Sequence, residues 1–267
     1  MIIDGKRIAE GIYNDLRSRV TALQNAPILT IFTCNPNFET QKYLSLKERK
    51  ARDIGVQTVV IHIEETCTTE EFVSRIHSAV PVSDGIIVQL PLPVHIESAT
   101  VLQSVPVSHD VDVLGGTHTN MLSPVVGAFK EILEREGISR VGKYVNIIGS
   151  GRLVGLPASA WFMNEGAHVS VVTKDTHDIV HYTKNADIVV CGAGVPGLLK
   201  PDMVKEDVVI LDAGTSEDGG VLRGDADPAC ALKARVFTPV PGGIGPITIA
   251  ILLRNVVDCA TQKQGVV

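Results

Sequence analysis

The chain has 267 residues, of which 45% are hydrophobic and 20% charged, and its formal net charge at pH 7 is −6. This composition is typical of a globular protein rather than a disordered chain, and the negative charge argues against a nucleic-acid partner. Five scattered cysteines without a CxxC pair, a start without a signal-peptide pattern and apolar runs of strand length predict a cytoplasmic protein with no metal site, disulfide or membrane span.

The first half of the sequence alternates helical and strand patterns. Apolar residues with helical spacing occur over 7–23, 39–54 and 69–80. Short β-branched runs, which are typical of strands, occur at 28–33, 59–63 and 85–90. This alternation predicts a parallel, doubly wound α/β sheet in a first domain at 1–122. A loop-rich stretch over 106–120 ends this domain, and a helix predicted at 125–136 leads away from it.

The second half repeats the alternation around a glycine-rich turn. Strand patterns occur at 144–149, 168–173, 186–194 and 208–214. With a helix predicted at 155–166, they predict a Rossmann-like dinucleotide-binding domain over 123–246. A last apolar helix is predicted at 247–260 and has no strand partner left in that domain. We therefore expect the segment 247–267 to return to the first domain and complete it.

The main nucleotide-binding signal is the turn GSGRLVG, formed by Gly149, Ser150, Gly151, Arg152, Leu153, Val154 and Gly155. It follows a predicted strand and opens a predicted helix, whose N-terminus offers free N–H groups to phosphate. Its spacing is GxGxxxG instead of GxGxxG, so a purely structural turn is the alternative. The loops that follow the next strands are expected to contact the same cofactor, through Thr173, Lys174, Gly192, Ala193, Gly214 and Thr215.

Cofactor choice is read at the end of the second strand of such a domain. A carboxylate there favours the free ribose hydroxyl of NAD, and a cation favours the 2′-phosphate of NADP. Lys174 and Asp175 stand side by side at this point and favour opposite choices. We expect NADP, with NAD as the alternative. A third interpretation is that Lys174 and Asp175 are solvated loop charges with no role in cofactor choice.

Four polar residues of the first half are candidates for chemistry. Tyr43 and Lys47 are four apart on a predicted helix and hence share a face. Gln89 ends a predicted parallel strand, where ligands bind in such sheets. Asp110 and Asp112 lie on one side of their segment if that segment is extended. Taken singly, each of these signals also fits a solvated surface residue.

Together and in this order, these motifs resemble the bifunctional methylenetetrahydrofolate dehydrogenase/cyclohydrolase family over nearly the whole chain. The matching motifs are YxxxK at Tyr43 and Lys47, VQLPLP at 88–93, DVD at 110–112, GxxxxVGxP at 149–157 and TPVPGGIGPIT at 238–248. The resemblance implies a homodimer with a folate cleft between its two domains. It also implies NADP-dependent oxidation of 5,10-methylenetetrahydrofolate to 5,10-methenyltetrahydrofolate, followed by hydrolysis to 10-formyltetrahydrofolate.

The resemblance also assigns roles to residues. It implies that Lys47 is the acid–base group of hydrolysis and that Gln89 holds and tunes it. Tyr43 is expected to stack on the aminobenzoyl part of the folate, and Asp112 to bind the amino edge of the pterin. The other residues expected to line the folate site are Leu90, Pro91, Gly243, Ile244 and Pro246.

The sequence departs from the family pattern at three places. Val113 follows the DVD motif where the family usually has glycine, the loop at 123–127 is shortened, and Ser150-Gly151 replaces a common Arg-Ser pair. These departures leave the choice between NADP and NAD open. They also leave two alternatives: a dehydrogenase without efficient hydrolysis, and a catalytically weak paralogue that binds nucleotide or folate.

Overall fold

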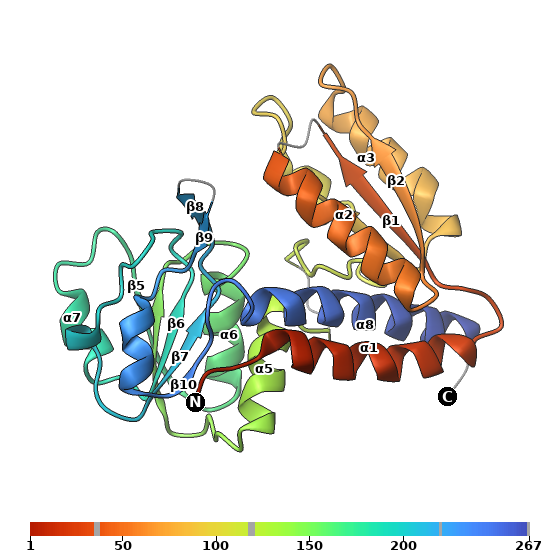
Figure 1. The fold of residues 1–267 in the computed structure, drawn as a ribbon. Coiled ribbons are helices and arrows are strands. Elements are labelled where there is room, and N and C mark those ends of the chain that lie inside the picture. Colours follow the sequence, from red (N-terminus) through yellow and green to blue (C-terminus); the bar gives the residue numbers. More distant parts are fainter. Residues whose placement is uncertain (35–37, 117–120, 219–220, 266–267) are drawn as a thin grey trace. The chain divides into compact units, whose positions relative to one another are not determined.

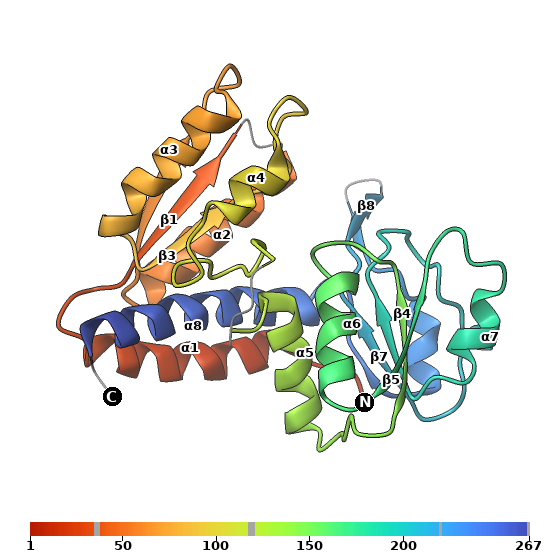
Figure 2. The same cartoon turned by 180° about the vertical axis from the view of Figure 1, so that it is seen from behind.

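The computed structural model describes the chain except for residues 35–37, 117–120, 219–220 and 266–267. Its contacts divide the chain into two compact units, each built from two segments. The N-terminal unit comprises Glu10–Pro124 and Ile249–Val267, and the C-terminal unit comprises Met1–Ala9 and Val125–Thr248. Figures 1 and 2 show the helices and strands of both units from opposite sides.

The N-terminal unit holds a small parallel sheet flanked by helices. Its strands are β1 (Ile28–Thr33), β2 (Gln57–His62) and β3 (Gly85–Val88). Its helices are α1 (Gly5–Thr21), α2 (Phe38–Asp53), α3 (Thr69–Ala79), the short 3₁₀ helix η1 (Val80–Val82), α4 (Ser98–Gln103) and α8 (Ile244–Gln264), of which α1 and α8 also contribute their first residues to the C-terminal unit. The strand order is β2-β1-β3, so the chain passes from β1 to one neighbour and then crosses to the other side of β1. The carboxyl ends of β1 and β3 therefore form a switch point, the usual place for a ligand in such a sheet.

One core cluster of this unit packs two helices against a single face of the sheet. Phe32 and Ile86 from the strands contact Phe72 and Ile76 of α3, and Leu102 of α4 completes the cluster. The rings of Phe32 and Phe72 lie 5.7 Å apart between centroids. Because each of these side chains is at most 3% exposed, this burial is a main source of stability for the unit.

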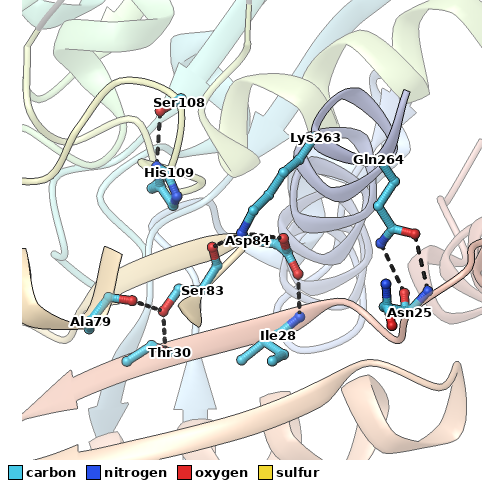
Figure 3. A network of polar contacts seen from close by, with 10 residues as sticks. All are labelled: Asn25, Ile28, Thr30, Ala79, Ser83, Asp84, Ser108, His109, Lys263 and Gln264. Atoms are coloured by element: carbon cyan, nitrogen blue, oxygen red, sulfur yellow. Dashed lines mark hydrogen bonds and ion pairs between the residues drawn. The ribbon is translucent and has the colours of Figure 1, made fainter. Parts of the chain in front are cut away.

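The amino end of the same sheet is tied to the last turn of α8 by polar contacts (Figure 3). The Asp84 carboxylate accepts a hydrogen bond from the Ile28 amide at 2.8 Å and lies 3.3 Å from the Lys263 Nζ atom. Lys263 also donates to the Ser83 carbonyl at 3.1 Å. Gln264 adds contacts to the backbone at Asn25. These contacts hold the amino end of the sheet in place, whereas loops form its carboxyl end.

The C-terminal unit is built on a five-stranded parallel sheet with the order β10-β7-β6-β4-β5. Its strands are β4 (Tyr144–Ile148), β5 (His168–Val172), β6 (Ile188–Cys191), β7 (Val208–Asp212) and β10 (Ala234–Phe237), and β8 (Ser216–Asp218) and β9 (Val221–Arg223) form an antiparallel pair beside it. Its helices are α5 (Pro124–Arg135), α6 (Gly155–Asn164) and α7 (Ile179–Thr183), with the 3₁₀ helices η2 (Pro201–Met203) and η3 (Pro228–Leu232). The chain leaves β4 for β5 and then crosses to β6 on the other side, which creates a second switch point between β4 and β6.

These features confirm the predicted fold class of two α/β domains with a C-terminal helix that completes the first. The structure also differs from the prediction at the start of the chain. The Ile3 amide donates to the Phe237 carbonyl and the Phe237 amide to the Met1 carbonyl, both at 2.9 Å. Because the first residues add to the edge of β10, Met1–Ala9 lies with the C-terminal unit, whereas we had placed it in the first domain.

Helix α8 is longer than the predicted 247–260. By length and composition it could cross a membrane, the one such helix among the described residues, which corrects our expectation that apolar runs reach only strand length. However, 67% of its most apolar stretch is buried inside the protein, as in a core helix of a globular fold. All five cysteines are buried and free.

Candidate active site and nucleotide-binding loops

The structure brings Lys47 and Gln89 into contact at the carboxyl end of β3. Lys47 lies on α2, is 6% exposed, and its Nζ atom donates to the Gln89 Oε1 atom at 3.0 Å. Gln89 directly follows β3, and its amide N–H donates to the Phe32 carbonyl at 2.8 Å. Its side-chain Nε2 atom donates to the Leu90 carbonyl at 3.1 Å, so the amide oxygen is turned toward the lysine. Lys47, predicted from its helical spacing, and Gln89, predicted from its place at a strand end, therefore lie in contact.

Tyr43 lies one turn before Lys47 on the same face of α2. The Lys47 Nζ atom is 5.6 Å from the centroid of the Tyr43 ring, within the range of a cation–π contact. The residue keeps 40% of its surface exposed. Partial desolvation of the phenol, together with the negative Asp112 carboxylate, raises the pKa of Tyr43 to about 12. The tyrosine is therefore neutral at physiological pH and offers part of its surface to a ligand.

Burial and a neighbouring charge act in opposite directions on the Lys47 amine. Desolvation lowers the pKa of Lys47, and the nearby Asp112 carboxylate opposes this change. Desolvation also raises the pKa of Asp112, and Lys47 opposes that change in turn. Because desolvation is the larger effect on each group, the lysine pKa moves toward the range in which an amine exchanges protons near neutral pH.

The two aspartates of the DVD motif have different surroundings. The segment turns at this point: the Val113 amide donates to the Asp110 carbonyl at 3.2 Å. Asp110 is buried, and its carboxylate accepts from the backbone amides of Leu114 at 3.3 Å and Gly115 at 2.8 Å. It therefore shapes the loop, while Asp112 interacts with Lys47 and Tyr43. The extended segment that would place both carboxylates on one side is not what the chain adopts.

Val113 has a backbone conformation that is rare for a β-branched residue. Its φ angle is +56°, in the left-handed region that glycine enters without steric cost. The strain is of the order of 1–3 kcal/mol and persists only where surrounding contacts impose it. Here the turn at Asp110 does so, and the Asn255 side chain of α8 donates to the Val111 carbonyl at 2.9 Å.

Asn255 was not among our candidate residues. It is 5% exposed and donates a second hydrogen bond to the Leu122 carbonyl at 3.1 Å. It thereby anchors the loop that carries Asp112. The available signal was a lone amide in an apolar helix, which by itself does not reveal its partner.

The remaining predicted folate residues fall in both units. Leu90 and Pro91 follow Gln89 in the N-terminal unit and are joined by a cis peptide bond. Gly243, Ile244 and Pro246 belong to the C-terminal unit, at the start of α8. The Gly243 amide donates to the Pro239 carbonyl at 2.7 Å, and a Cβ atom on Gly243 would lie 2.6 Å from that carbonyl oxygen. This tight turn therefore requires glycine.

The glycine turn directly follows β4, at the switch point of the C-terminal unit. Gly149 has φ +100°, and a Cβ atom on it would lie 2.6 Å from the Gly192 carbonyl oxygen. A Cβ atom on Gly155 would lie 2.0 Å from the Gly149 carbonyl oxygen. The loops after β4 and β6 can thus approach each other this closely only without side chains. Gly149, Gly155 and Gly192 therefore lie together at this switch point, and all three are residues that the sequence predicts for the nucleotide site.

The first turn of α6 fits a phosphate group. Its N-cap residue, Val154, provides no side-chain hydrogen bond. The Leu156 amide donates to the Gly151 carbonyl at 3.0 Å and Pro157 has no N–H group, so few amides of this turn are free. No described atom lies within 4 Å of where a Cβ atom on Gly151 would be, so the space in front of the turn is open. Ser150 and Arg152 are exposed beside it. The open space and the positive end of the helix dipole favour an anion here.

The other predicted cofactor residues lie in loops at the carboxyl edge of the same sheet. Thr173 directly follows β5, and its hydroxyl accepts from the Asp175 amide at 3.3 Å. Lys174 and Asp175 are both exposed there. The other residues of this kind are Ala193 after β6 and Gly214 and Thr215 after β7. In the described part of the chain, His, Cys, Asp and Glu side chains form no group of three suited to a metal ion.

Comparisons with known proteins identify both units. The family description "Tetrahydrofolate dehydrogenase/cyclohydrolase, catalytic domain" matches residues 3–112. The description "Tetrahydrofolate dehydrogenase/cyclohydrolase, NAD(P)-binding domain" matches residues 124–264. A relative named bifunctional protein FolD, from a Hydrogenobaculum species, is 36% identical over 275 residues, covering 98% of this chain and 99% of the relative.

Two solved structures extend the likeness to the fold. The bifunctional FolD enzyme, methylenetetrahydrofolate dehydrogenase/cyclohydrolase, from Campylobacter jejuni has a TM-score of 0.94 and 33% identity, covering 98% of this chain and 99% of its own. The methylenetetrahydrofolate dehydrogenase-cyclohydrolase of Trypanosoma brucei, solved with NADP and an inhibitor, has a TM-score of 0.92 and 30% identity, covering 98% of each chain. The chain described here therefore belongs to the tetrahydrofolate dehydrogenase/cyclohydrolase family, as an enzyme with both activities and an NAD(P)-binding domain.

Proposed function

We propose that Lys47, Gln89, Tyr43 and Asp112 form the folate and cyclohydrolase site of this enzyme, and that the loops after β4, β5, β6 and β7 hold NADP. The enzyme oxidises 5,10-methylenetetrahydrofolate to 5,10-methenyltetrahydrofolate and hydrolyses that product to 10-formyltetrahydrofolate. The observation that carries the assignment of the hydrolytic site is the buried Lys47 amine, held 3.0 Å from the Gln89 oxygen with its pKa lowered by desolvation.

Hydrolysis requires a group that exchanges protons with water. The methenyl carbon bridges N5 and N10 and carries a positive charge. Water adds to this carbon with release of one proton, and the bond from the carbon to N5 then breaks as the new hydroxyl group passes its proton to N5, which gives the 10-formyl product. A neutral amine can take that proton as the oxygen–carbon bond forms, whereas a permanently charged ammonium cannot. Gln89 accepts a hydrogen bond from Lys47 in either protonation state, and its own bond to the Leu90 carbonyl fixes which end of the amide faces the lysine. Lys47 thus has one orientation.

Tyr43 and Asp112 are suited to place the folate. The part-exposed Tyr43 ring offers a flat apolar surface on which another ring can stack. The Asp112 charge raises the pKa values of both Tyr43 and Lys47, which indicates that this carboxylate lies near both residues. A carboxylate there can accept hydrogen bonds from the amino edge of a pterin, a strong and orienting contact.

The oxidation step relies on the C-terminal unit. NADP supplies the hydride acceptor when it is bound. The uncapped first turn of α6 and the open space at Gly151 are suited to its phosphates. Arg152 and Lys174 provide exposed cations near the turn and at the end of β5, which supports NADP over NAD. The chain's own task in this step is binding and orientation.

A two-cofactor assay tests this function. The purified enzyme is given 5,10-methylenetetrahydrofolate with NADP or with NAD, and both reduced nicotinamide and 10-formyl product are followed. We expect both to form, with NADP preferred. Reduced nicotinamide without formyl product would identify a dehydrogenase that has lost hydrolysis. Absence of turnover with either cofactor, despite measurable binding, would identify a binding paralogue and contradict the proposal.

We further propose that the enzyme is a cytoplasmic homodimer. The resemblance to the family supports the dimer, and the five scattered cysteines support a reducing cytoplasm. Size-exclusion chromatography with light scattering should find a mass of two chains of 28.5 kDa each at micromolar concentration. A mass of one chain would contradict the dimer.

A further inference from the structure

Two buried carboxylates lie behind the loops that follow β6 and β7 in the C-terminal unit. Asp212 ends β7 and is 1% exposed, and Asp225 precedes η3 and is fully buried. A buried carboxylate is costly unless hydrogen bonds compensate it, so the partners of these two groups reveal what they hold in place.

Asp225 is surrounded by the backbone of the loop after β6. One carboxylate oxygen accepts from the amides of Ala193 at 2.7 Å and Gly194 at 3.1 Å. The other accepts from the Val195 amide at 2.8 Å. Three consecutive amides thus converge on one side chain. A carboxylate is suited to this because it only accepts, whereas a neutral amide side chain would bring an N–H group against these donors.

Asp212 in turn holds Asp225 and the loop after β7. Its carboxylate accepts from the amides of Gly214 at 2.9 Å, Asp225 at 3.3 Å and Ala226 at 2.8 Å. A Cβ atom on Gly214 would lie 2.1 Å from the Asp225 carboxyl carbon. The space at this point is therefore filled by the carboxylate itself, and the two aspartates connect the loops after β6 and β7 from the inside.

The loop that Asp225 holds lies against the glycine turn that we propose for the nucleotide. It starts at Gly192, whose carbonyl oxygen approaches Gly149 so closely that no side chain fits between them. Ala193, Gly194 and Val195 follow with their outer surfaces exposed. A shift of their amides would move the loop that lies against the glycine turn, at the switch point where dinucleotides bind in such sheets.

We propose that Asp225 is a positioning residue for the cofactor: by accepting three amides of residues 193–195, it sets the shape of the loop against which NADP binds. The inference rests on the proposed function, because it assigns this loop to the NADP site. Asp225 itself lies behind the loop and acts through the loop backbone. Its effect should therefore fall on cofactor affinity and leave the cofactor-independent hydrolysis of the N-terminal unit unchanged.

The test compares Asp225→Asn and Asp225→Ser with Asp227→Asn as a matched control. Asp227 lies two residues further along the chain, and its replacement by asparagine removes the same charge. Unlike Asp225, it caps η3 by accepting a hydrogen bond from the Ala229 amide, and it pairs with Lys200. The readouts are the NADP dissociation constant from titration calorimetry, KM for NADP and kcat at saturating NADP, and the rate of methenyltetrahydrofolate hydrolysis without nucleotide. The serine variant, smaller and able to accept one amide, is included because the asparagine variant places an N–H group against a buried donor.

We expect both Asp225 variants to raise the NADP dissociation constant and KM by at least about tenfold, the factor that corresponds to about 1.4 kcal/mol. We expect kcat at saturating NADP and the hydrolysis rate to stay within about threefold of the unmodified enzyme. Asp227→Asn should leave all four values unchanged. An unchanged NADP dissociation constant in both variants, or equal loss of hydrolysis and NADP binding in both, would overturn the inference. Absence of NADP reduction by 5,10-methylenetetrahydrofolate in the unmodified enzyme would instead refute the proposed function.

Discussion

The Lys47 amine is a case in which several weak contacts define one chemical property. Its burial lowers the pKa, the Asp112 charge partly restores it, and the Gln89 oxygen fixes its direction. None of these effects requires a bound folate. The group that we propose for hydrolysis is therefore oriented without a substrate, and the substrate would need only to bring its carbon into reach.

Replacing Lys47 with alanine should abolish methenyltetrahydrofolate hydrolysis, with a loss of about 10²- to 10⁴-fold, the usual contribution of a general acid–base group. NADP binding, measured by calorimetry, should not change. Lys50→Ala on the same helix is the matched control, because Lys50 pairs with Glu10 and Asp53 near the Tyr13 ring. Undiminished hydrolysis in Lys47→Ala would remove this lysine from the mechanism.

Asp212 should make stability fall as pH rises. Burial raises its pKa from 3.8 to about 7, so the folded protein keeps a proton that the unfolded chain has already lost. Its contribution is fully present below about pH 4 and is lost as pH rises toward about 7. Urea unfolding at pH 5 and pH 8 should show a larger decrease, on the order of a few kcal/mol, in the unmodified enzyme than in Asp212→Asn. Equal decreases in both proteins would refute this linkage.

At the scale of elements, long periodic segments were predictable and short ones were not. The helices α1, α2, α3, α5 and α8 and the parallel strands other than β10 follow from apolar spacing in the sequence. The six residues of α4 and the five of α7 are too short to show a period. Strand β10 is as short as β3 and β6, but Arg235 interrupts its apolar run, so no strand pattern is visible there. It gains its place from pairing with β7 and the first residues of the chain.

The candidate site shows the same division. The helical spacing of Tyr43 and Lys47 and the strand-end position of Gln89 pointed to one place, and the structure joins Lys47 to both. The roles of Asn255 and Asp225 depend on backbone groups far away in sequence, at Val111 and at residues 193–195. No local pattern encodes such partners, because any polar side chain can bond a backbone amide or carbonyl.

Helix α8 should affect folate binding through Asn255. In Asn255→Ala, the carbonyls of Val111 and Leu122 lose a buried donor, at a cost of about 1–3 kcal/mol in unfolding free energy. The loop that carries Asp112 should loosen, so KM for the folate substrate should rise more than kcat falls. Gln262→Ala, on an exposed position of the same helix, is the control. An unchanged KM in a destabilised Asn255→Ala protein would contradict the link to the loop.

At the scale of the whole molecule, the candidate groups for the two reactions fall in different units. Lys47, Gln89 and Asp112 lie in the N-terminal unit, and the glycine turn lies in the C-terminal unit. The two activities should therefore be separable by mutation, even though one chain carries both. The fold also contains a switch point in each unit, at the carboxyl ends of β1 and β3 and of β4 and β6, and the candidate residues of each unit lie there.

Gly149→Ala tests this separation. A Cβ atom at this position would lie 2.6 Å from the Gly192 carbonyl oxygen at a φ angle that only glycine adopts easily, so the turn must shift. NADP-dependent oxidation should fall by at least about tenfold, whereas methenyltetrahydrofolate hydrolysis should persist. Gly11→Ala is the control, because no described atom lies within 4 Å of its added methyl group. Parallel loss of both activities in Gly149→Ala would show that the units do not function separately.

The return of α8 to the N-terminal unit has a consequence for biosynthesis. During translation, β1, β2 and β3 leave the ribosome first, but Lys263, the partner of Asp84, is added only after the whole C-terminal unit has been made. Until then, the nascent sheet lacks the helix that covers it. The N-terminal unit must therefore complete its folding after its neighbour in the chain has been synthesised, although it comes first in the sequence.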